Sequence, residues 1–287
     1  MKKITLILFA ATTYIFSNIN TVVSILPEQT FVKAIGGDKV NVALMVKPGN
    51  SPHNYEPKPS QMVDISKADL YFAIGVEFEH AWLPKFKNLN PKMQVIDLAD
   101  NVTKIRMPEA HEEDGHDTHH SEHAHKGDDP HIWTAPSNVK IIAKNIYAAL
   151  AKKDPEHTGY YKANLDAFLL TVEETDAKIK EILLGIGNER KFMVFHPSWG
   201  YFSKAYNLEQ IAVEVEGKEP KPKELMHLLK EAKEERVKAI FTQPEFSDAV
   251  ATIIAKELQI PVIKISPLSP NWSENLINIA NNIANKN

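Results

Sequence analysis

Six of the chain's twelve histidines crowd into one short segment. Residues 111–125 read HEEDGHDTHHSEHAH, which places six histidines and five acidic residues in fifteen positions. Neutral imidazole is the commonest metal-binding side chain and is available near neutral pH, because its unperturbed pKa is about 6.5. The segment is polar and has no apolar periodicity, so we expect a loop. It indicates metal binding, but a loop rarely builds a fixed site alone.

Three further histidines lie in proline-flanked motifs. His53 occurs in PGNSPHNYEP, His131 in DPHIW and His196 in FHPSWGYF. His53 and His196 follow apolar runs that read as strands, and ligand sites in open α/β sheets lie beyond the carboxyl ends of strands. Proline neighbours reduce the freedom lost on ordering a site. One such histidine alone is usually a loop residue bonded to backbone, whereas the three together indicate a metal site. The others are expected to be ordinary surface residues: His80, His157 and His227.

Short apolar runs alternate with amphipathic segments, which predicts a parallel sheet with crossover helices. Strands are expected at 21–27, 40–46, 69–75, 94–99, 191–195, 208–215, 238–244 and 261–266. Helices are expected at 28–36, 58–67, 137–153, 156–185, 199–206, 222–235, 247–258 and from 273, with Ser137 as a cap. The long helix reads as a rigid connector rather than a core helix. The predicted fold is α/β, with two parallel-sheet lobes flanked by helices, one long connecting helix and the metal site in the cleft.

The first residues have the pattern of a secretory signal peptide. Lys2 and Lys3 precede an apolar run of thirteen residues, which is shorter than the ~20 that span a bilayer. We therefore assign residues 1–20 to a cleaved signal. The remaining limits are expected at 21–154 for the N-terminal lobe, including a histidine-rich loop at 111–128, at 155–186 for the connecting helix, and at 187–287 for the C-terminal lobe.

The net charge and the absence of cysteine limit the kinds of function that this chain can have. A net charge of −4 with scattered lysines gives no basic surface for nucleic acid. Cysteine is absent, so disulfides, thiolate ligands and a lipid-modified cysteine are ruled out, and a metal would take nitrogen and oxygen ligands. From the signal and the missing lipid site we expect a monomer in the periplasm that is not a lipoprotein.

Three motifs carry a resemblance to a known family. SPHNYEPKPSQM, DPHIWTAPSN and FHPSWGYFSKAYNL look like the ligand motifs of the metal-binding proteins that serve ATP-binding-cassette (ABC) importers of zinc and manganese. With a histidine-rich loop between the first two motifs, the chain is similar to the ZnuA type. The resemblance implies a carrier rather than an enzyme, which binds Zn²⁺ between two lobes and delivers it to a membrane permease.

Carried over to this chain, His53, His131 and His196 match the three histidine ligands of that family. Manganese-selective relatives tend to have glutamate at the third position, whereas imidazole suits zinc. The fourth ligand is open. Some zinc relatives have glutamate where this chain has Pro52, so water, Glu56 or a histidine of the loop could complete the site. Glu56 and Asp129 are also candidates to hold a ligand ring through its other nitrogen.

Other functions remain as alternatives. The chain could be a manganese- or iron-binding relative, or a zinc hydrolase, since three imidazoles and a water also form a catalytic site. HExxH is absent, and no general base or substrate pocket is evident. An adhesin is a third alternative, although no adhesive repeat or wall anchor is found.

Deletion of residues 111–125 should separate the loop from the fixed site. If the loop is a weak collector, tethering holds captured zinc near the cleft at an effective concentration of about mM. The variant should then keep one tight zinc site and lose weaker ones in a calorimetric titration. Loss of the tight site would instead make the loop part of it, and unchanged stoichiometry would leave the loop a solvated linker.

Overall fold

The structure is a computed structural model and describes residues 18–107, 127–187, 189–214 and 218–285. It contains two four-stranded parallel sheets, with orders β2-β1-β3-β4 and β6-β5-β7-β8. The first sheet is built from β1 (Ile19–Val23), β2 (Val40–Leu44), β3 (Leu70–Ala73) and β4 (Gln94–Asp97). The second is built from β5 (Lys191–Val194), β6 (Glu209–Ala212), β7 (Ile240–Thr242) and β8 (Val262–Lys264). The two sheets share one strand order, and each has its switch point beside its first strand.

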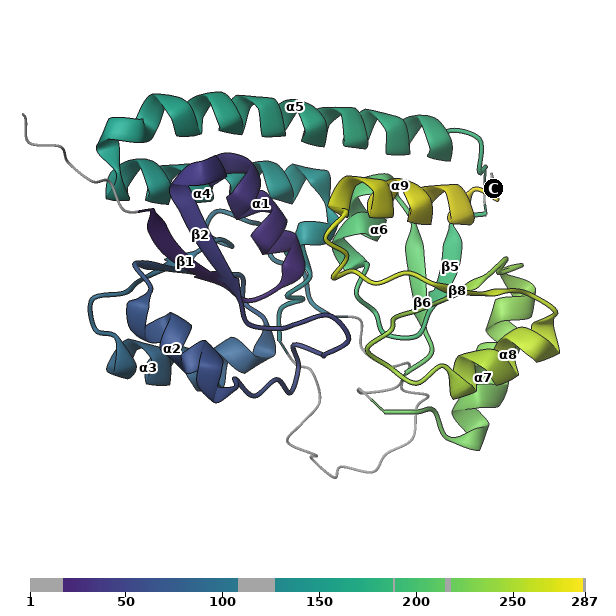
Figure 1. Ribbon diagram of the computed structural model, residues 1–287. Helices are drawn as coiled ribbons and strands as arrows, with labels where there is room; N and C mark the ends of the chain where they lie inside the picture. Colours follow the sequence, from purple (N-terminus) through teal and green to yellow (C-terminus); the bar gives the residue numbers. More distant parts are fainter. Residues whose placement is uncertain (1–17, 108–126, 188, 215–217, 286–287) are drawn as a thin grey trace, which may run out of the picture.

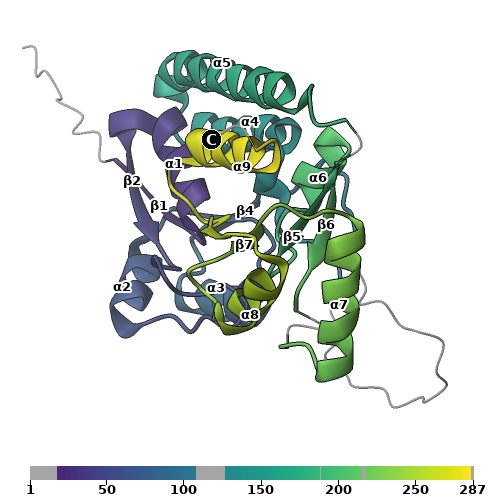
Figure 2. The same cartoon turned by 90° about the vertical axis from the view of Figure 1, so that its right-hand side faces the viewer.

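Helices cover both faces of each sheet (Figures 1 and 2). In the N-terminal lobe they are α1 (Leu26–Gly36), α2 (Pro59–Lys67), α3 (Glu77–Leu89) and α4 (Pro136–Lys153). In the C-terminal lobe they are α6 (Gly200–Tyr206), α7 (Pro222–Glu234), α8 (Ala249–Leu258) and α9 (Trp272–Ile283). Short 3₁₀ turns occupy Gly37–Lys39, Ile132–Thr134 and Pro155–His157. Several helices begin at a proline, whose fixed φ suits the first helical turn.

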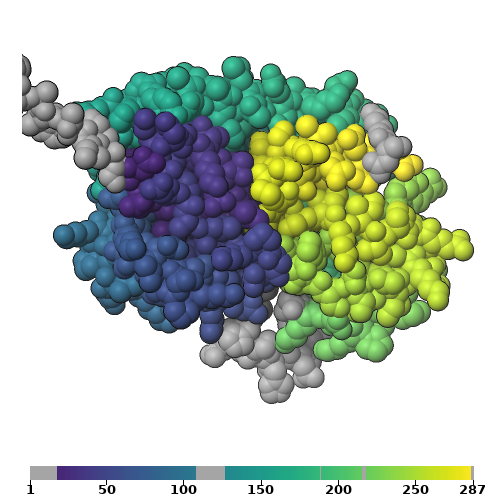
Figure 3. Space-filling model, viewed as in Figure 1, coloured from purple at the N-terminus to yellow at the C-terminus, as the bar shows by residue number. Residues whose placement is uncertain are grey.

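The long helix α5 (Thr158–Leu183) crosses both lobes. Figures 1 and 2 show it above α4 and α9, and in Figure 3 its teal surface runs over both halves. Asn164 Nδ2 donates to Ile35 O of α1 at 3.0 Å, and Thr175 Oγ1 lies 2.5 Å from Ser273 Oγ of α9. One face of α5 is buried in the core, from Tyr161 to Leu183. The predicted long connecting helix is therefore confirmed, but it is also a core helix, because it joins the lobes by packing one face into the core.

The main hydrophobic core runs through both lobes. Phe31 of α1 packs edge-on against Trp272 of α9, with ring centroids 5.7 Å apart. Trp133 Nε1 donates to Pro267 O at 2.8 Å, and Trp272 Nε1 donates to Trp133 O at 2.7 Å. A smaller cluster lies within the C-terminal lobe, between its sheet and helices α7 and α8. The segment around Trp133 is thus buried where the two lobes meet.

Several details differ from the sequence-based expectation. No element was predicted over α3, which contains Pro84, a residue that usually ends a helix. Strand β1 begins at Ile19, inside the segment assigned to the signal, and Ala135 rather than Ser137 precedes α4. The lobe limits stay predictions. Residues 1–17 and 108–126, with nearly all of the predicted signal and loop, lie outside the described residues.

Within the described ranges, no helix has both the length and the apolar composition needed to cross a bilayer.

Two leucines of α5 give a matched test of its packing. Leu165 is 4% exposed and Leu170 is 61% exposed. In metal-free protein, Leu165→Ala should lower the free energy of unfolding by about 2–4 kcal/mol, because it leaves a cavity in the core. Leu170→Ala, the same change on the same helix, should alter it by less than about 0.5 kcal/mol. Urea unfolding measures both, and equal effects would contradict a buried face on α5.

Candidate metal centre

The structure brings His53, His131 and His196 together from three separate segments. Each ring offers a nitrogen, and these nitrogens lie within 4.8 Å of one another. His53 lies between β2 and α2, His131 directly precedes the 3₁₀ turn before α4, and His196 follows β5. Ring centroids are 4.6 Å apart for His53 and His196 and 5.3 Å apart for His131 and His196. Within the described residues, this is the group with the composition and spacing of a metal site.

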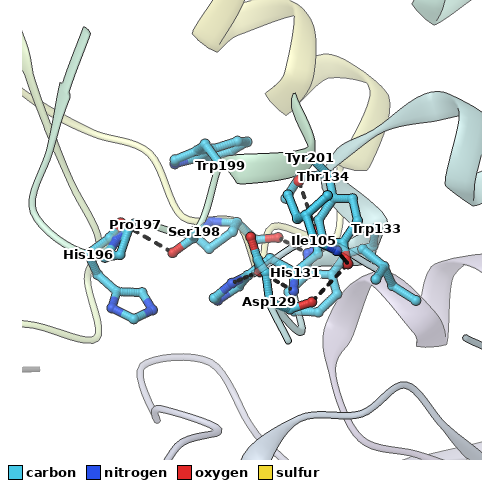
Figure 4. A network of polar contacts seen from close by, with 12 residues as sticks. Ile105, Asp129, His131, Trp133, Thr134, His196, Pro197, Ser198, Trp199 and Tyr201 are labelled. Atoms are coloured by element: carbon cyan, nitrogen blue, oxygen red, sulfur yellow. Dashed lines mark hydrogen bonds and ion pairs between the residues drawn. The ribbon is translucent and has the colours of Figure 1, made fainter. Parts of the chain in front are cut away.

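Each ring is held from behind by a carboxylate at Nδ1. Glu77 Oε1 lies 2.8 Å from His53 Nδ1, Asp129 Oδ1 lies 2.8 Å from His131 Nδ1, and Glu214 Oε1 lies 2.6 Å from His196 Nδ1. Such a contact fixes both the orientation and the tautomer of an imidazole and increases its basicity as a ligand. Figure 4 shows Asp129 against His131, with His196 reaching in from another segment.

The nitrogens that face one another are the second nitrogens of these rings. A neutral imidazole whose Nδ1–H donates to a carboxylate keeps a lone pair on Nε2. His53 Nε2 lies 3.0 Å from His196 Nε2, so two neutral rings would place lone pair against lone pair. That approach is favourable only when a proton or a cation lies between the nitrogens. The arrangement is therefore suited to a small cation.

Protonation differs between the rings. Burial, together with the neighbouring His131 and His53, lowers the pKa of His196 to about 4, although Glu214 acts in the opposite direction. Burial also lowers the pKa of His53, but the contact with Glu77 outweighs it and the pKa is raised overall. The same contact, against burial, lowers the pKa of Glu77 to about 2. His196 is thus neutral near neutral pH, whereas His53 holds a proton more readily than a free imidazole and competes more strongly with a metal as the pH decreases.

Other side chains fix His196 in place. Gln243, which follows β7, donates from Nε2 to His196 O at 2.9 Å and so bonds across the switch point beside β5. Phe246 stacks on the His196 ring with centroids 4.9 Å apart, and its ring is 6.2 Å from that of His53. An apolar ring against the site limits water access and lowers the local dielectric constant.

The structure places some of the residues predicted from the sequence at the histidine cluster and others away from it. Asp129 contacts His131 as hypothesised, whereas Glu56 is exposed and does not belong to the histidine cluster. Glu77 and Glu214 were not predicted. Glu77 follows β3, so the strand-end rule could have identified it, whereas Glu214 fell inside the strand expected at 208–215 and follows β6 only in the structure. The surface histidines fall elsewhere: His80 and His227 are exposed, and His157 Nδ1 lies 2.7 Å from Asp154.

Curated relatives of this chain are bacterial metal-binding proteins. SloC of Streptococcus mutans, a metal ABC transporter substrate-binding lipoprotein, is 32% identical over 80% of this chain and 74% of its own length. ScaA of Streptococcus gordonii, named for manganese, is 31% identical over 80% and 73%. The zinc-binding lipoprotein AdcA of Streptococcus pneumoniae is 26% identical over 87% of this chain, which spans 50% of AdcA.

Solved structures agree with this picture. A crystal structure of ZnuA matches with a TM-score of 0.84 and 41% identity over 94% of this chain and 99% of that chain. The laminin-binding adhesin Lmb of Streptococcus agalactiae matches with a TM-score of 0.77 over 93% of this chain and 100% of its own. At 24% identity, that second likeness concerns the fold alone.

The predicted location is corrected by these relatives. We expected a periplasmic protein that is not a lipoprotein, but SloC and ScaA, like AdcA, are named lipoproteins of Gram-positive bacteria. The expectation relied on the absence of cysteine, and a cysteine count does not tell one cell envelope from another. The relatives support a substrate-binding protein that faces the outside of the cell.

A family model agrees with both sets of relatives. The model described as "Zinc-uptake complex component A periplasmic" matches residues 21–286, nearly the whole chain. Two parallel sheets with flanking helices and a long connecting helix, as predicted, are the fold of the ZnuA structure it resembles. The chain therefore belongs to the ZnuA family of substrate-binding components of metal ABC transporters.

Proposed function

We propose that this protein captures Zn²⁺ with His53, His131 and His196 and delivers it to the membrane permease of an ABC importer. One observation carries the proposal: three imidazoles from separate segments converge within 4.8 Å. Each has a carboxylate at Nδ1, which leaves Nε2 for the metal. Three neutral imidazoles leave one tetrahedral position, with Zn–N distances of about 2.0–2.1 Å.

The ligand chemistry favours zinc over manganese. Relatives are named for either metal, so family membership alone does not choose between them. Carboxylate and water ligands suit manganese, whereas imidazole suits zinc. In the described part of the chain the cluster consists of histidines, and its carboxylates lie behind the rings rather than among the metal-facing nitrogens. Glu56 lies outside the cluster, which leaves water or a histidine of the loop as the fourth ligand.

A carrier fits the site better than a zinc hydrolase. Hydrolysis at a zinc-bound water needs a general base within hydrogen-bond reach of that water. The carboxylates that touch the cluster, Glu77, Asp129 and Glu214, each contact the Nδ1 of a ring, which is the positioning role found behind metal ligands. The family's role as a substrate-binding component supports the same choice.

Alanine variants of the three histidines test the zinc site. His53→Ala, His131→Ala and His196→Ala should each weaken zinc binding by more than about 100-fold, because losing a ligand costs more than losing an outer partner. His80→Ala is the matched control, since His80 is exposed on α3 and lies outside the cluster. Competition titration with a zinc chelator measures the affinities, and parallel titration with Mn²⁺ should show weaker binding.

Wild-type affinity for the three alanine variants would contradict the proposed ligands. Tighter binding of Mn²⁺ than of Zn²⁺ by the unmodified protein would contradict the proposed metal. Turnover of test esters or of carbon dioxide by the zinc-loaded protein would favour the hydrolase instead.

Zinc affinity should decrease as the pH decreases, and the protonation of His53 should account for this dependence. Its pKa is raised by Glu77, so zinc displaces a proton from this ring and binding weakens as pH falls through that value. His196, with a pKa of about 4, stays neutral in the same range and adds no pH dependence there. Zinc titrations between about pH 8 and about pH 5.5 measure the effect.

Glu77→Gln is the matched variant for this pH dependence. Without the carboxylate the pKa of His53 should fall, so the loss of affinity between neutral and acidic pH should become smaller. A flat affinity for the unmodified protein across the range would rule out histidine ligands that compete with protons.

A further inference from the structure

The two carboxylate oxygens of Asp129 have different surroundings. The residue is fully buried. Its Oδ1 accepts hydrogen bonds from both the backbone N and the ring Nδ1 of His131, each at 2.8 Å. Its Oδ2 is buried and has no hydrogen-bond partner among the described residues. The carboxylate therefore sets the orientation of the His131 ring, and its own position depends on what lies against Oδ2.

Gly200, the first residue of α6, lies against that oxygen. A Cβ built on Gly200 would be 2.4 Å from Asp129 Oδ2 and 3.2 Å from Ile105 Cδ1. Gly200 is not among the glycines with positive φ, so its backbone would accept any residue. What excludes a side chain is the carboxylate itself. Because Oδ1 is held by two hydrogen bonds, the carboxylate cannot turn aside without releasing His131.

The next residue of α6 holds the backbone of Asp129. Tyr201 OH donates to Asp129 O at 3.0 Å and accepts from Ile105 N at 3.3 Å. Asp129 N in turn donates to Ile105 O at 2.7 Å. Figure 4 shows Tyr201, Ile105, Asp129 and His131 joined in one network. The first turn of α6 thus meets both the main chain and the side chain of Asp129.

We propose that Gly200 is a positioning residue for the metal site: its missing side chain leaves the space in which the Asp129 carboxylate aims His131 at the metal. The inference rests on the proposed zinc site. Gly200 follows His196 by four positions, so the segment that supplies one ligand also sets the orientation of another. The two lobes are coupled at the site through this contact, in addition to the metal.

Gly200→Ala tests the inference, with Gly159→Ala as the matched control. Gly159 also lies in the first turn of a helix, α5, and nothing lies within 4 Å of a Cβ built there. Gly200→Ala should weaken zinc binding by about 10- to 100-fold, the range for loss of an outer partner, while Gly159→Ala leaves it unchanged. Alanine favours helix more than glycine, so the substitution does not lower the intrinsic helix propensity of α6.

A double-mutant cycle shows whether Gly200 acts through Asp129. In an Asp129→Ala background the carboxylate is gone, so Gly200→Ala should change zinc affinity by less than about twofold. A second readout is the visible absorption of the Co²⁺-loaded protein, which reports ligand geometry. Gly200→Ala should shift these bands, and Gly159→Ala should not. If Asp129→Ala fails to fold, the Co²⁺ absorption bands still show whether Gly200 affects the geometry of the metal ligands.

Three results would overturn the inference. They are wild-type zinc affinity for Gly200→Ala, an equal loss of affinity with and without Asp129, and unchanged Co²⁺ bands in Gly200→Ala. Failure of the proposed function looks different, because the unmodified protein would then bind no zinc or the three histidine variants would bind it normally.

Discussion

Three buried or half-buried carboxylates each hold an imidazole by Nδ1, and the rest of the site follows from that constraint. With Nδ1 occupied, the Nε2 atoms of His53 and His196 face one another at 3.0 Å. Bringing lone pairs together is unfavourable, so the surrounding structure must impose the approach, and a cation relieves it. The protein therefore spends folding free energy on a geometry that a divalent ion makes favourable.

The fold supplies that geometry through strand ends and buried inter-lobe contacts. His53 and His196, with Glu77, Glu214 and Gln243, all follow strands of the two parallel sheets. His131 is different, because it lies on a long connection and is positioned by neighbours from both lobes. Trp133 bonds to the C-terminal lobe on one side of it, and Asp129 meets α6 on the other. The segment without a strand of its own is thus as deeply buried as the strand end that supplies His196.

Much of the architecture could be predicted from the sequence, because strands and helices alternate clearly and prolines mark the helix starts. The three histidines were found because each lies in a proline-flanked motif, two of them after a strand. Glu77 was missed together with α3, whose internal proline hid the helical pattern. Glu214 was missed because its role exists only once β6 lies beside β5. Glu56, close to His53 in sequence, is exposed, since neighbours in a proline-rich loop need not share a direction.

The boundary between the two hydrophobic clusters does not coincide with the boundary between the two sheets. The larger hydrophobic cluster includes residues of α1, α4, α5 and α9 and one face of β5 and β7, whereas the smaller cluster lies between the other face of that sheet and helices α7 and α8. Regions that share a core open together, and weakly connected layers open at lower free energy. The cooperative unit of folding is therefore the N-terminal lobe plus the inner half of its neighbour. The outer layer of α7 and α8 packs on a cluster of its own, so we expect it to open at a lower free energy than the core that the two lobes share.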